Sequence, residues 1–384
     1  MPTEVGRLSA TKSYFSWQNN EALTGTLPTQ LGRLTSLTGY LRLYKNKFTS
    51  SIPTEMGLMT GVATDFYLYS NDLCGAIPAE VTALSSQVAV WDILTDTFVG
   101  PTPCPAVSAL VALYEGTAGT AWTAKNGWMG SSSGPGDPCT TGWEGVTCST
   151  SGEEVTELSL LINGLDGTVP TQIGLLSSVT ADFYLYSNAI SSSLPTEIGK
   201  LSLLTSGFSL GANEMTKAIP SEVGQLTGLL AAGGNYQNAF LVYNEFSGRI
   251  PTQLGDMTKM ASQFNLGAND LTASIPSELT RLTESSYYFS LHSNSKMTGT
   301  IATEFGLFTK LTQILHFYNL DLTGSIPSQL GNMPFTASTG YFFNLASNKL
   351  KSTIPTELGR PAFQRSFYLN SNELTGEEVA SSPS

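Results

Sequence analysis

The feature of this sequence that most constrains its fold is an apolar residue followed by proline, which recurs about every 25 residues. Pro28, Pro53 and Pro78 follow one another at this spacing (53 − 28 = 25 and 78 − 53 = 25), and it resumes at Pro170. Such a period is the signature of stacked structural repeats. Ile301-Ala302 fills one gap in a series that otherwise consists of Leu27-Pro28, Ile52-Pro53, Ile77-Pro78, Val169-Pro170, Leu194-Pro195, Ile219-Pro220, Ile250-Pro251, Ile275-Pro276, Ile326-Pro327 and Ile354-Pro355.

Each repeat unit predicts one coil of chain. A short alternating run such as Phe66-Tyr67-Leu68-Tyr69 predicts a strand whose apolar residues point inward. After the Pro, Ser or Thr is expected to cap a single helical turn, and a Gly is expected to end it. A buried Asn between strand and Pro is expected to satisfy backbone groups of neighbouring coils. Six positions fit this column: Asn71, Asn188, Asn213, Asn244, Asn269 and Asn348.

The aligned pattern, L-x-L-x-x-N-x-h-[ST]-G-x-I-P-[ST]-[EQ], resembles the plant-type leucine-rich repeat over nearly the whole chain. The resemblance implies an α/β leucine-rich-repeat solenoid with a parallel concave β-sheet, short 3-10 or α turns on the convex side and a right-handed superhelix. The departures are local. Leu320 replaces the Asn, with Asn319 beside it; Thr82 and Thr280 replace the Gly; and residues are inserted around 232–237.

One large step interrupts the period, because Pro78 and Pro170 are 92 residues apart (170 − 78 = 92). It contains a Pro-rich segment, an expected helix over 106–114 and the stretch D-P-C-T-T-G-W-E-G-V-T-C at 137–148, which resembles the N-terminal cap of plant-type leucine-rich-repeat ectodomains. A cap in mid-chain implies two arrays in series. We therefore expect a first array at 1–104, a cap-like segment at 105–154 and a second array at 155–384.

The four cysteines indicate the compartment. Cys74 lies in the last regular coil and Cys104 in the Pro-rich segment, which suggests a disulfide that closes the first array. The cap resemblance implies a second disulfide between Cys139 and Cys148. Four free buried thiols are the alternative. Because no C-x-x-C spacing occurs, the pattern favours an extracellular or cell-surface protein.

The ends of the sequence bear on the same question. The chain opens without a signal peptide, and Pro2 stands 26 residues before Pro28 (28 − 2 = 26), one repeat away. We expect a fragment that starts and stops inside coils. No apolar run is long enough to span a membrane, so no membrane insertion is expected within this chain.

Charge excludes one class of partner. The chain of 384 residues has 18 Lys+Arg and 30 Asp+Glu, a net charge of −12, which repels phosphate backbones, so no nucleic-acid partner is expected. Part of this charge is the Glu that recurs at each helix start, at Glu55, Glu80, Glu197, Glu222 and Glu278.

No motif predicts an enzyme or a cofactor. Two G-x-S-x-G matches surround Ser132 and Ser209, but Ser132 lies in a Ser/Gly-rich loop and Ser209 on an expected strand, whereas a nucleophile elbow needs a strand, a sharp turn and a helix. The helix-start Glu residues have a structural explanation. The sequence also lacks a phosphate-binding loop and a zinc-protease motif.

The two histidines, His292 and His316, fall at outward positions on adjacent expected strands. A metal site needs a third ligand, and the nearest polar residues, Ser290, Asn319 and Asn344, are poor ligands. We therefore expect surface strand residues and no metal.

The outward strand positions are rich in tyrosine, which offers large, rigid contact area with a polar tip. The candidate ligand-binding strip comprises Arg42, Tyr44, Tyr67, Tyr69, Tyr184, Tyr186, Phe240, Tyr243, His316, Tyr318 and Tyr368. The alternative is that Tyr lies there only because it favours strands.

These observations favour a non-enzymatic recognition scaffold. The resemblance implies a receptor-like ectodomain or a secreted inhibitor of wall-degrading enzymes, with a protein, peptide or glycan ligand on the concave face. The alternative is a solenoid that binds an ice or polysaccharide surface, as the low charge (12% of residues) and regular Ser, Thr and Asn content suggest.

Overall fold

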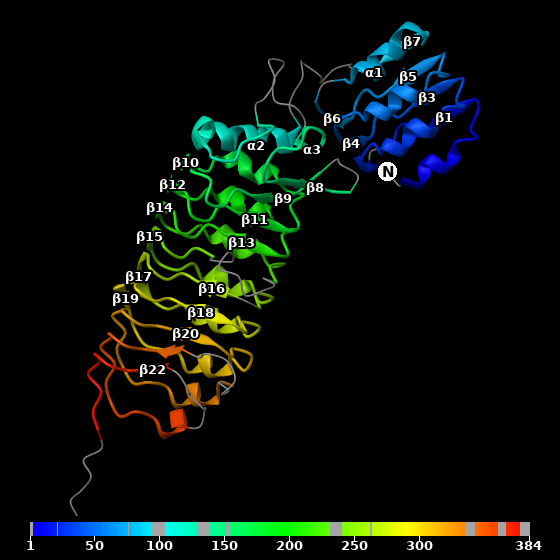
Figure 1. Ribbon diagram of the computed structural model, residues 1–384. Helices are drawn as coiled ribbons and strands as arrows, with labels where there is room; N and C mark the ends of the chain where they lie inside the picture. The colour runs from blue at the N-terminus through cyan, green and yellow to red at the C-terminus, as the bar shows by residue number, and fades with distance from the viewer. Residues whose placement is uncertain are drawn as a thin grey trace, which may run out of the picture. The chain divides into compact units, whose positions relative to one another are not determined.

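The computed structural model describes residues 3–20, 22–75, 77–93, 104–128, 138–150, 154–230, 240–261, 263–334, 342–359 and 366–376. The chain divides into two compact units. Unit 1 comprises 1–111 and 127–155, and unit 2 comprises 112–126 and 156–384. Both consist of stacked coils, as Figure 1 shows.

Unit 1 contains two parallel sheets, in the orders β1-β3-β5-β7 and β2-β4-β6. The alternating runs form the first sheet, and the extended pieces before the prolines form the second. The elements are β1 (Tyr14–Ser16), β2 (Thr24–Thr26), β3 (Tyr40–Arg42), β4 (Lys47–Ser50), β5 (Asp65–Tyr67), β6 (Asp72–Leu73) and β7 (Val90–Asp92), with the helices η1 (Thr3–Leu8), η2 (Thr29–Arg33), η3 (Thr54–Leu58), α1 (Ala79–Thr82) and η4 (Ala83–Ser86).

Unit 2 repeats this plan over more coils. Its alternating runs give β9 (Val155–Ser159), β11 (Asp182–Tyr184), β13 (Gly207–Ser209), β16 (Gln263–Asn265), β18 (Tyr288–Ser290), β20 (Ile314–His316), β21 (Phe342–Asn344) and β22 (Ser366–Tyr368). Its extended pieces give β10 (Asp166–Gly167), β12 (Ala189–Ser192), β14 (Glu214–Lys217), β15 (Glu245–Gly248), β17 (Asp270–Ser274) and β19 (Lys296–Thr298).

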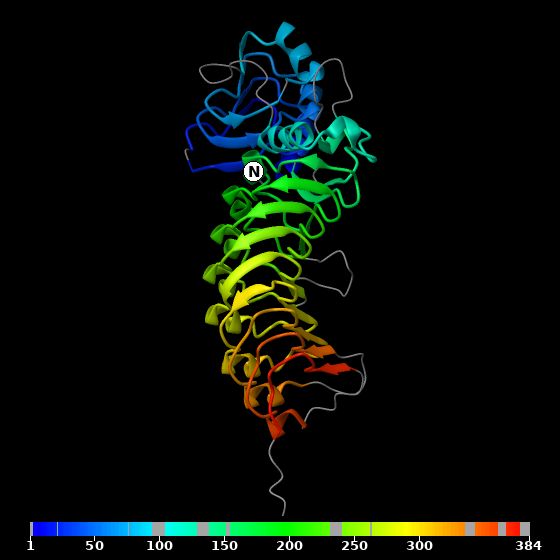
Figure 2. The ribbon, with the colours of Figure 1, turned by 90° about the vertical axis from the view of Figure 1, so that its left-hand side faces the viewer.

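The extended pieces of unit 2 form a sheet of their own. They pair in parallel in the order β10-β12-β14-β15-β17-β19, a second sheet that the sequence pattern did not predict. Figure 1 shows the two sheets as separate columns of strands along the stack, and Figure 2 turns the second sheet toward the viewer.

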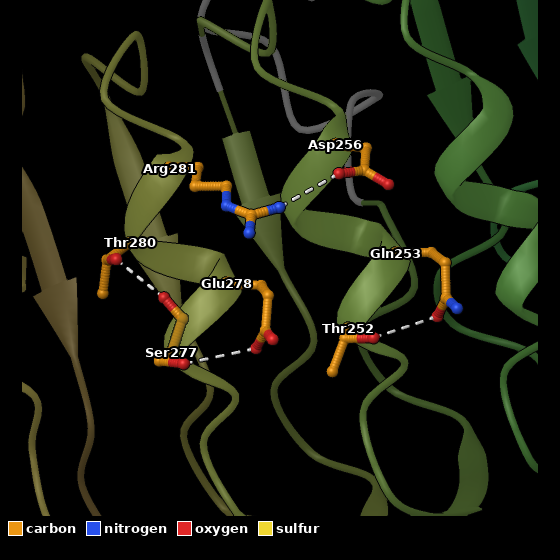
Figure 3. A network of polar contacts seen from close by, with 7 residues as sticks. All are labelled: Thr252, Gln253, Asp256, Ser277, Glu278, Thr280 and Arg281. Carbon is orange, nitrogen blue, oxygen red and sulfur yellow. Dashed lines mark hydrogen bonds and ion pairs between the residues drawn. The ribbon is translucent and has the colours of Figure 1, made fainter.

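The helical turns after the prolines are mostly 3-10 helices, as expected. In unit 2 they are η6 (Thr171–Leu175), η7 (Thr196–Lys200), η8 (Ser221–Gln225), η10 (Thr252–Asp256), η11 (Ser277–Arg281), η12 (Thr303–Leu307), η13 (Ser328–Asn332) and η14 (Thr356–Gly359). The predicted Ser/Thr N-cap is wrong. Pro251 occupies the N-cap of η10 without a side-chain cap bond, and the Thr252 hydroxyl instead lies 3.3 Å from Gln253 Oε1, as Figure 3 shows.

The predicted role of the repeat Gly is also wrong. Gly255 lies inside η10, and a Cβ placed there would collide with the backbone carbonyl of Glu278 in the next helix. The Gly therefore permits close helix approach. Figure 3 shows η10 beside η11, where Arg281 Nη1 reaches Asp256 Oδ1 at 3.3 Å across an exposed pair.

The asparagine column is confirmed. Asn269 Nδ2 lies 3.1 Å from both Leu241 O and Leu266 O, and the Phe246 amide donates to Asn269 Oδ1 at 3.0 Å. Each side chain therefore joins its own coil to the preceding one, while the inward Leu and Phe columns form a buried core. Asn46, Asn294 and Asn372 belong to the same ladder.

The ladder is interrupted at Leu320, which is buried. In regular coils, the backbone amide two residues after a ladder Asn donates to the side-chain Oδ1 of the ladder Asn in the next coil, as Phe246 N does to Asn269 Oδ1. In the coil of Asn294 the turn is one residue longer, and the Met297 amide bonds to Asn294 O at 2.9 Å instead. The longer turn thus compensates for the missing side chain. The insertion around 232–237 lies outside the described residues.

The segment between the arrays contains α2 (Pro105–Gly116), η5 (Gly119–Ala121), α3 (Pro138–Thr141) and β8 (Val146–Cys148). In unit 2, the last residue of α2 and the residues after it bond to the first coil: Thr168 N donates to Gly116 O at 2.8 Å, and Asn163 Nδ2 to Ala124 O at 2.9 Å. Trp122 is buried beside them. The expected helix is therefore present and extends two residues beyond its predicted C-terminal end.

Both suggested disulfides are present, Cys74–Cys104 and Cys139–Cys148, with Cα atoms 4.8 and 5.6 Å apart. In unit 1, Trp128 and Trp143 pack together with ring centroids 4.7 Å apart. No helix in the described part of the chain is both long and apolar enough to cross a membrane.

Candidate functional site

The outward positions of the first type of strand lie four and two residues before the ladder Asn. We call this surface the strand face of each unit. Because adjacent strands are parallel and in register, the side chains of one column lie beside one another: Arg42 pairs with Tyr67 in unit 1, and Ser290 with His316 in unit 2.

On the strand face of unit 1 the predicted residues come together. The rings of Tyr44 and Tyr69 stack with centroids 4.6 Å apart, and Tyr67 lies 5.9 Å from Tyr44 in an edge contact. Two residues upstream, Tyr14 and Tyr40 stack at 4.4 Å. These side chains and Arg42 form what we call the tyrosine–arginine cluster, which comprises Tyr14, Tyr40, Arg42, Tyr44, Tyr67 and Tyr69.

Arg42 is the charged centre of this cluster. Its Nε donates to Asp65 Oδ2 at 3.0 Å, and its guanidinium carbon lies 4.0 Å from the centroid of the Tyr40 ring. The hydrogen bond to Asp65 raises the pKa of Arg42. The guanidinium is thus fixed by a carboxylate and an aromatic ring.

In unit 2 the first predicted pair is less available. Tyr184 is 8% exposed, and its ring lies over Gly207, where any Cβ would collide with it. Burial, and then the neighbouring Asp182, raise the pKa of Tyr184. Tyr184 is therefore largely a packing residue, whereas Tyr186 remains half-buried.

Phe240 is a wrong prediction, because it is 1% exposed. Its ring lies in the core column between Phe208 and Phe264, at centroid distances of 5.9 and 5.5 Å. In the repeat register the sequence has Ala239 where the neighbouring coils have Phe208 and Phe264, and the ring of Phe240 fills this column. Tyr243 is 57% exposed, on a left-handed residue (φ 54°) directly before the ladder Asn.

The two histidines do meet across the sheet, with ring centroids 6.2 Å apart. His292 stacks on Tyr318 at 5.0 Å, and its Nδ1 lies 2.7 Å from Ser290 Oγ. His316 Nδ1 lies 3.3 Å from the hydroxyl of Tyr288. We call this group the histidine cluster; it comprises Tyr243, Tyr288, Ser290, His292, His316 and Tyr318.

The expectation of surface histidines is wrong for His292, which is 5% exposed, while His316 is half-buried. Burial lowers the pKa of both imidazoles to about 4, so both are neutral near pH 7. Among the described residues, no three His, Cys, Asp or Glu side chains lie close enough together to hold a metal ion.

Other predicted residues lie apart from these clusters. Tyr368, on β22, is 44% exposed and pairs in register with Asn344. Ser209 is buried on β13, without the turn of a nucleophile elbow, and Ser132 lies outside the described residues.

Sequence reasoning missed the outward column two residues further upstream. It supplies Tyr14, Tyr40 and Asp65 in unit 1, and Tyr288 and Phe342 in unit 2. The same two-residue period, extended by one step, could have found them.

Comparisons with known proteins place the fold. No family model matches the chain, and no curated protein matches it. Among solved structures, a TDR receptor matches with a TM-score of 0.50 and 22% identity, covering 97% of this chain and 54% of the receptor chain. A plant ice-binding protein matches with a TM-score of 0.50 and 20% identity, and the match covers 70% of this chain and 86% of the ice-binding protein.

The chain therefore has the plant-type leucine-rich-repeat fold, a solenoid of parallel strands and short 3-10 turns, as the repeat pattern predicted. It spans about half the length of the TDR receptor that it matches.

Proposed function

We propose that this chain is a non-enzymatic recognition scaffold that binds a protein, peptide or glycan on its strand faces. The observation that carries the proposal is the tyrosine–arginine cluster. Stacked tyrosines and a fixed guanidinium form one continuous surface on neighbouring strands, and Tyr and Arg are the residue types that dominate binding hot spots.

Pre-organisation strengthens this argument. The Tyr44 and Tyr69 rings already support each other, and Arg42 is held by Asp65, so a ligand would immobilise few free rotamers on binding.

The setting that we propose is extracellular or at a cell surface. Two disulfides in one chain suit an oxidising compartment, and one matching structure is a receptor. Signalling by a longer protein would require segments beyond this chain, so we propose only the ligand-binding part.

The test uses the purified full chain on an array of immobilised peptides and oligosaccharides. Tyr44→Ala with Tyr69→Ala should abolish the strongest signal, while Glu222→Ala, a half-buried residue of η8 in unit 2, should leave it unchanged. Equal signals from the wild type and the tyrosine variant would show that the cluster binds nothing on the array.

A second candidate function is binding to an ice or polysaccharide surface. Hydroxyl residues occupy equivalent positions on successive strands of the second sheet, none of them fully buried: Ser191, Thr216, Ser247, Thr272 and Thr298. Charged residues such as Glu214, Glu245 and Asp270 run beside them, which makes this the weaker candidate. Purified protein that leaves ice growing as unfaceted discs, with no gap between melting and freezing, rules out the ice surface.

A further inference from the structure

The strand face of unit 2 differs chemically from the rest of the molecule. From Tyr184 to Asn370, its two outward columns contain tyrosine, histidine, asparagine, serine and small or buried apolar residues, but no Asp, Glu, Lys or Arg among the described residues. In unit 1, by contrast, Arg42 and Asp92 occupy the same columns.

Charge is abundant elsewhere in unit 2. The second sheet carries Glu214, Glu245, Asp270 and Lys296, and the helices begin with Glu197, Glu222 and Glu304. The upstream outward column carries Asp182 beside Tyr184 on β11, so the neutral stretch of this face runs from β13 to β22 among the described residues. The whole chain, by contrast, has a net charge of −12.

In the C-terminal half of this face, five neighbouring strands place polar residues side by side. Asn265, Ser290, His316, Asn344 and Tyr368 pair in register from β16 to β22. We call these five residues the neutral row. The histidine cluster lies over its middle, with an asparagine on each side.

The two asparagines are oriented by the backbone. Asn265 Oδ1 accepts from the Gly267 amide at 3.0 Å, and Asn344 Oδ1 accepts from the Ala346 amide at 2.9 Å. No described residue accepts a hydrogen bond from either Nδ2. Both amide groups are thus fixed, with their N–H donors left for a ligand.

The imidazoles do not add charge. The groups that face His292 and His316 are Tyr243, Tyr288, Tyr318 and Ser290, together with the other imidazole, and none is a carboxylate that would stabilise an imidazolium. The rings stay neutral and can both donate and accept.

We propose that the accessible members of the neutral row, Asn265, His316, Asn344 and Tyr368, bind a neutral glycan chain together with the aromatic rings around them. Ser290 is fully buried and contributes through its hydrogen bond to His292. Hydroxyl groups need donors and acceptors without net charge, and the apolar faces of sugar rings pack on Tyr243, Tyr318 and Phe342, which are all at least partly exposed. A peptide with charged termini or a phosphate polymer would find no counter-charge on this face.

This inference rests on the proposed function and narrows it to one ligand class for unit 2. The test measures binding of the full chain to three soluble probes by calorimetry at pH 7. The probes are neutral β-linked glucose hexamers, galacturonate hexamers of matched length that carry a carboxylate on each ring, and a peptide hexamer with free termini.

The decisive variant is Asn265→Asp with Asn344→Asp. The change is nearly isosteric and keeps the oxygens that accept from Gly267 and Ala346, but it removes both donors and adds two negative charges. The matched control, Gln253→Glu with Asn332→Asp, adds the same two charges on exposed positions of η10 and η13.

We expect the wild type and the control to bind the neutral hexamer equally, and the decisive variant to lose at least about tenfold in affinity. Absence of binding to every neutral hexamer, or equal binding by the decisive variant, overturns the proposal. A peptide or galacturonate hexamer whose binding the decisive variant alone alters also overturns it, but leaves the recognition scaffold standing. Peptide binding that only the Tyr44 and Tyr69 variant removes supports the scaffold through unit 1.

Discussion

Replacing Asn269 with Ala should destabilise unit 2 strongly, although the side chain is small. Asn269 links two coils: its Oδ1 accepts from the Phe246 amide, and its Nδ2 lies 3.1 Å from the carbonyl oxygens of Leu241 and Leu266, and at the same distance from Gly267 O. The carbonyls keep a second donor each, because Asn244 Nδ2 also reaches Leu241 O at 3.2 Å and Asn294 Nδ2 reaches Leu266 O at 3.0 Å. The Phe246 amide has no such substitute among the described residues.

The magnitude follows from this difference. One buried amide left unsatisfied costs about 1–3 kcal/mol, and each of the two lost carbonyl bonds about 0.5–1.5 kcal/mol. The expected loss in free energy of unfolding is therefore about 2–6 kcal/mol. Urea unfolding followed by circular dichroism would measure it, with exposed Asn332→Ala as the control.

A second substitution tests whether the lost hydrogen bonds, and not the lost side-chain volume, cause the destabilisation. Asn269→Leu should be as harmful as Asn269→Ala, even though leucine occupies the equivalent position at Leu320. Leucine is tolerated there because the Met297 amide has a local acceptor, Asn294 O. A loss below about 1 kcal/mol for either Asn269 variant contradicts the ladder as a main source of coil-to-coil stability.

Two further predictions concern the helices and the histidines. Gly255→Ala should lower the free energy of unfolding by about 1–3 kcal/mol, because the new Cβ collides with the backbone of Glu278. Gly359→Ala should be close to neutral, because no atom lies within 4 Å of a Cβ at that position. Similar unfolding midpoints for the two variants would contradict the role of Gly255 in close helix packing. In the folded protein the pKa of His292 and of His316 is about 4, below the ordinary value of 6.5, so the unfolded chain binds more protons between these two pH values. The contribution of each neutral histidine to the free energy of unfolding is therefore fully present above pH 6.5. It falls by up to about 3 kcal/mol per histidine as the pH drops toward 4. His292→Gln with His316→Gln should flatten this fall in urea unfolding measured at both pH values, and an unchanged pH profile would refute it.

The repeat pattern predicted much of the fold because each of its columns has one structural task. The period located the coils, and the six asparagines were read correctly, since a buried amide in a turn has few other uses. The roles of Gly and Ser/Thr were predicted wrongly because the prediction considered each helical turn by itself and not its contacts with the helix of the next coil. Gly255 is explained only by Glu278 of the next coil, which lies 23 residues away in sequence (278 − 255 = 23).

The candidate site was predicted less well. The two-residue alternation of a strand predicts on which side of the sheet a residue lies, but not how its side chain is oriented or how deeply it is buried. Tyr184 was placed outward correctly, yet it folds down over Gly207 and is nearly buried. Phe240 fills the core column in a coil whose sequence has Ala239 where the neighbouring coils have Phe. The burial of His292 depends on Tyr318 and Tyr243 from two other coils, so no local pattern could reveal it.

The interrupted ladder at Leu320 bears on how unit 2 comes apart. In a stack held by nearest neighbours, opening begins where a link between two coils is missing. Between the coils of Asn294 and Leu320 the ladder asparagine is missing. The contacts that remain include Asn319 Nδ2, which lies 3.4 Å from Ser293 Oγ on the exposed side, and the packing of Phe289 against Phe317, with ring centroids 5.9 Å apart. Amide hydrogens of the coils from Leu320 to Asn372 should therefore exchange with solvent as one cooperative block, before those of the coils that precede them.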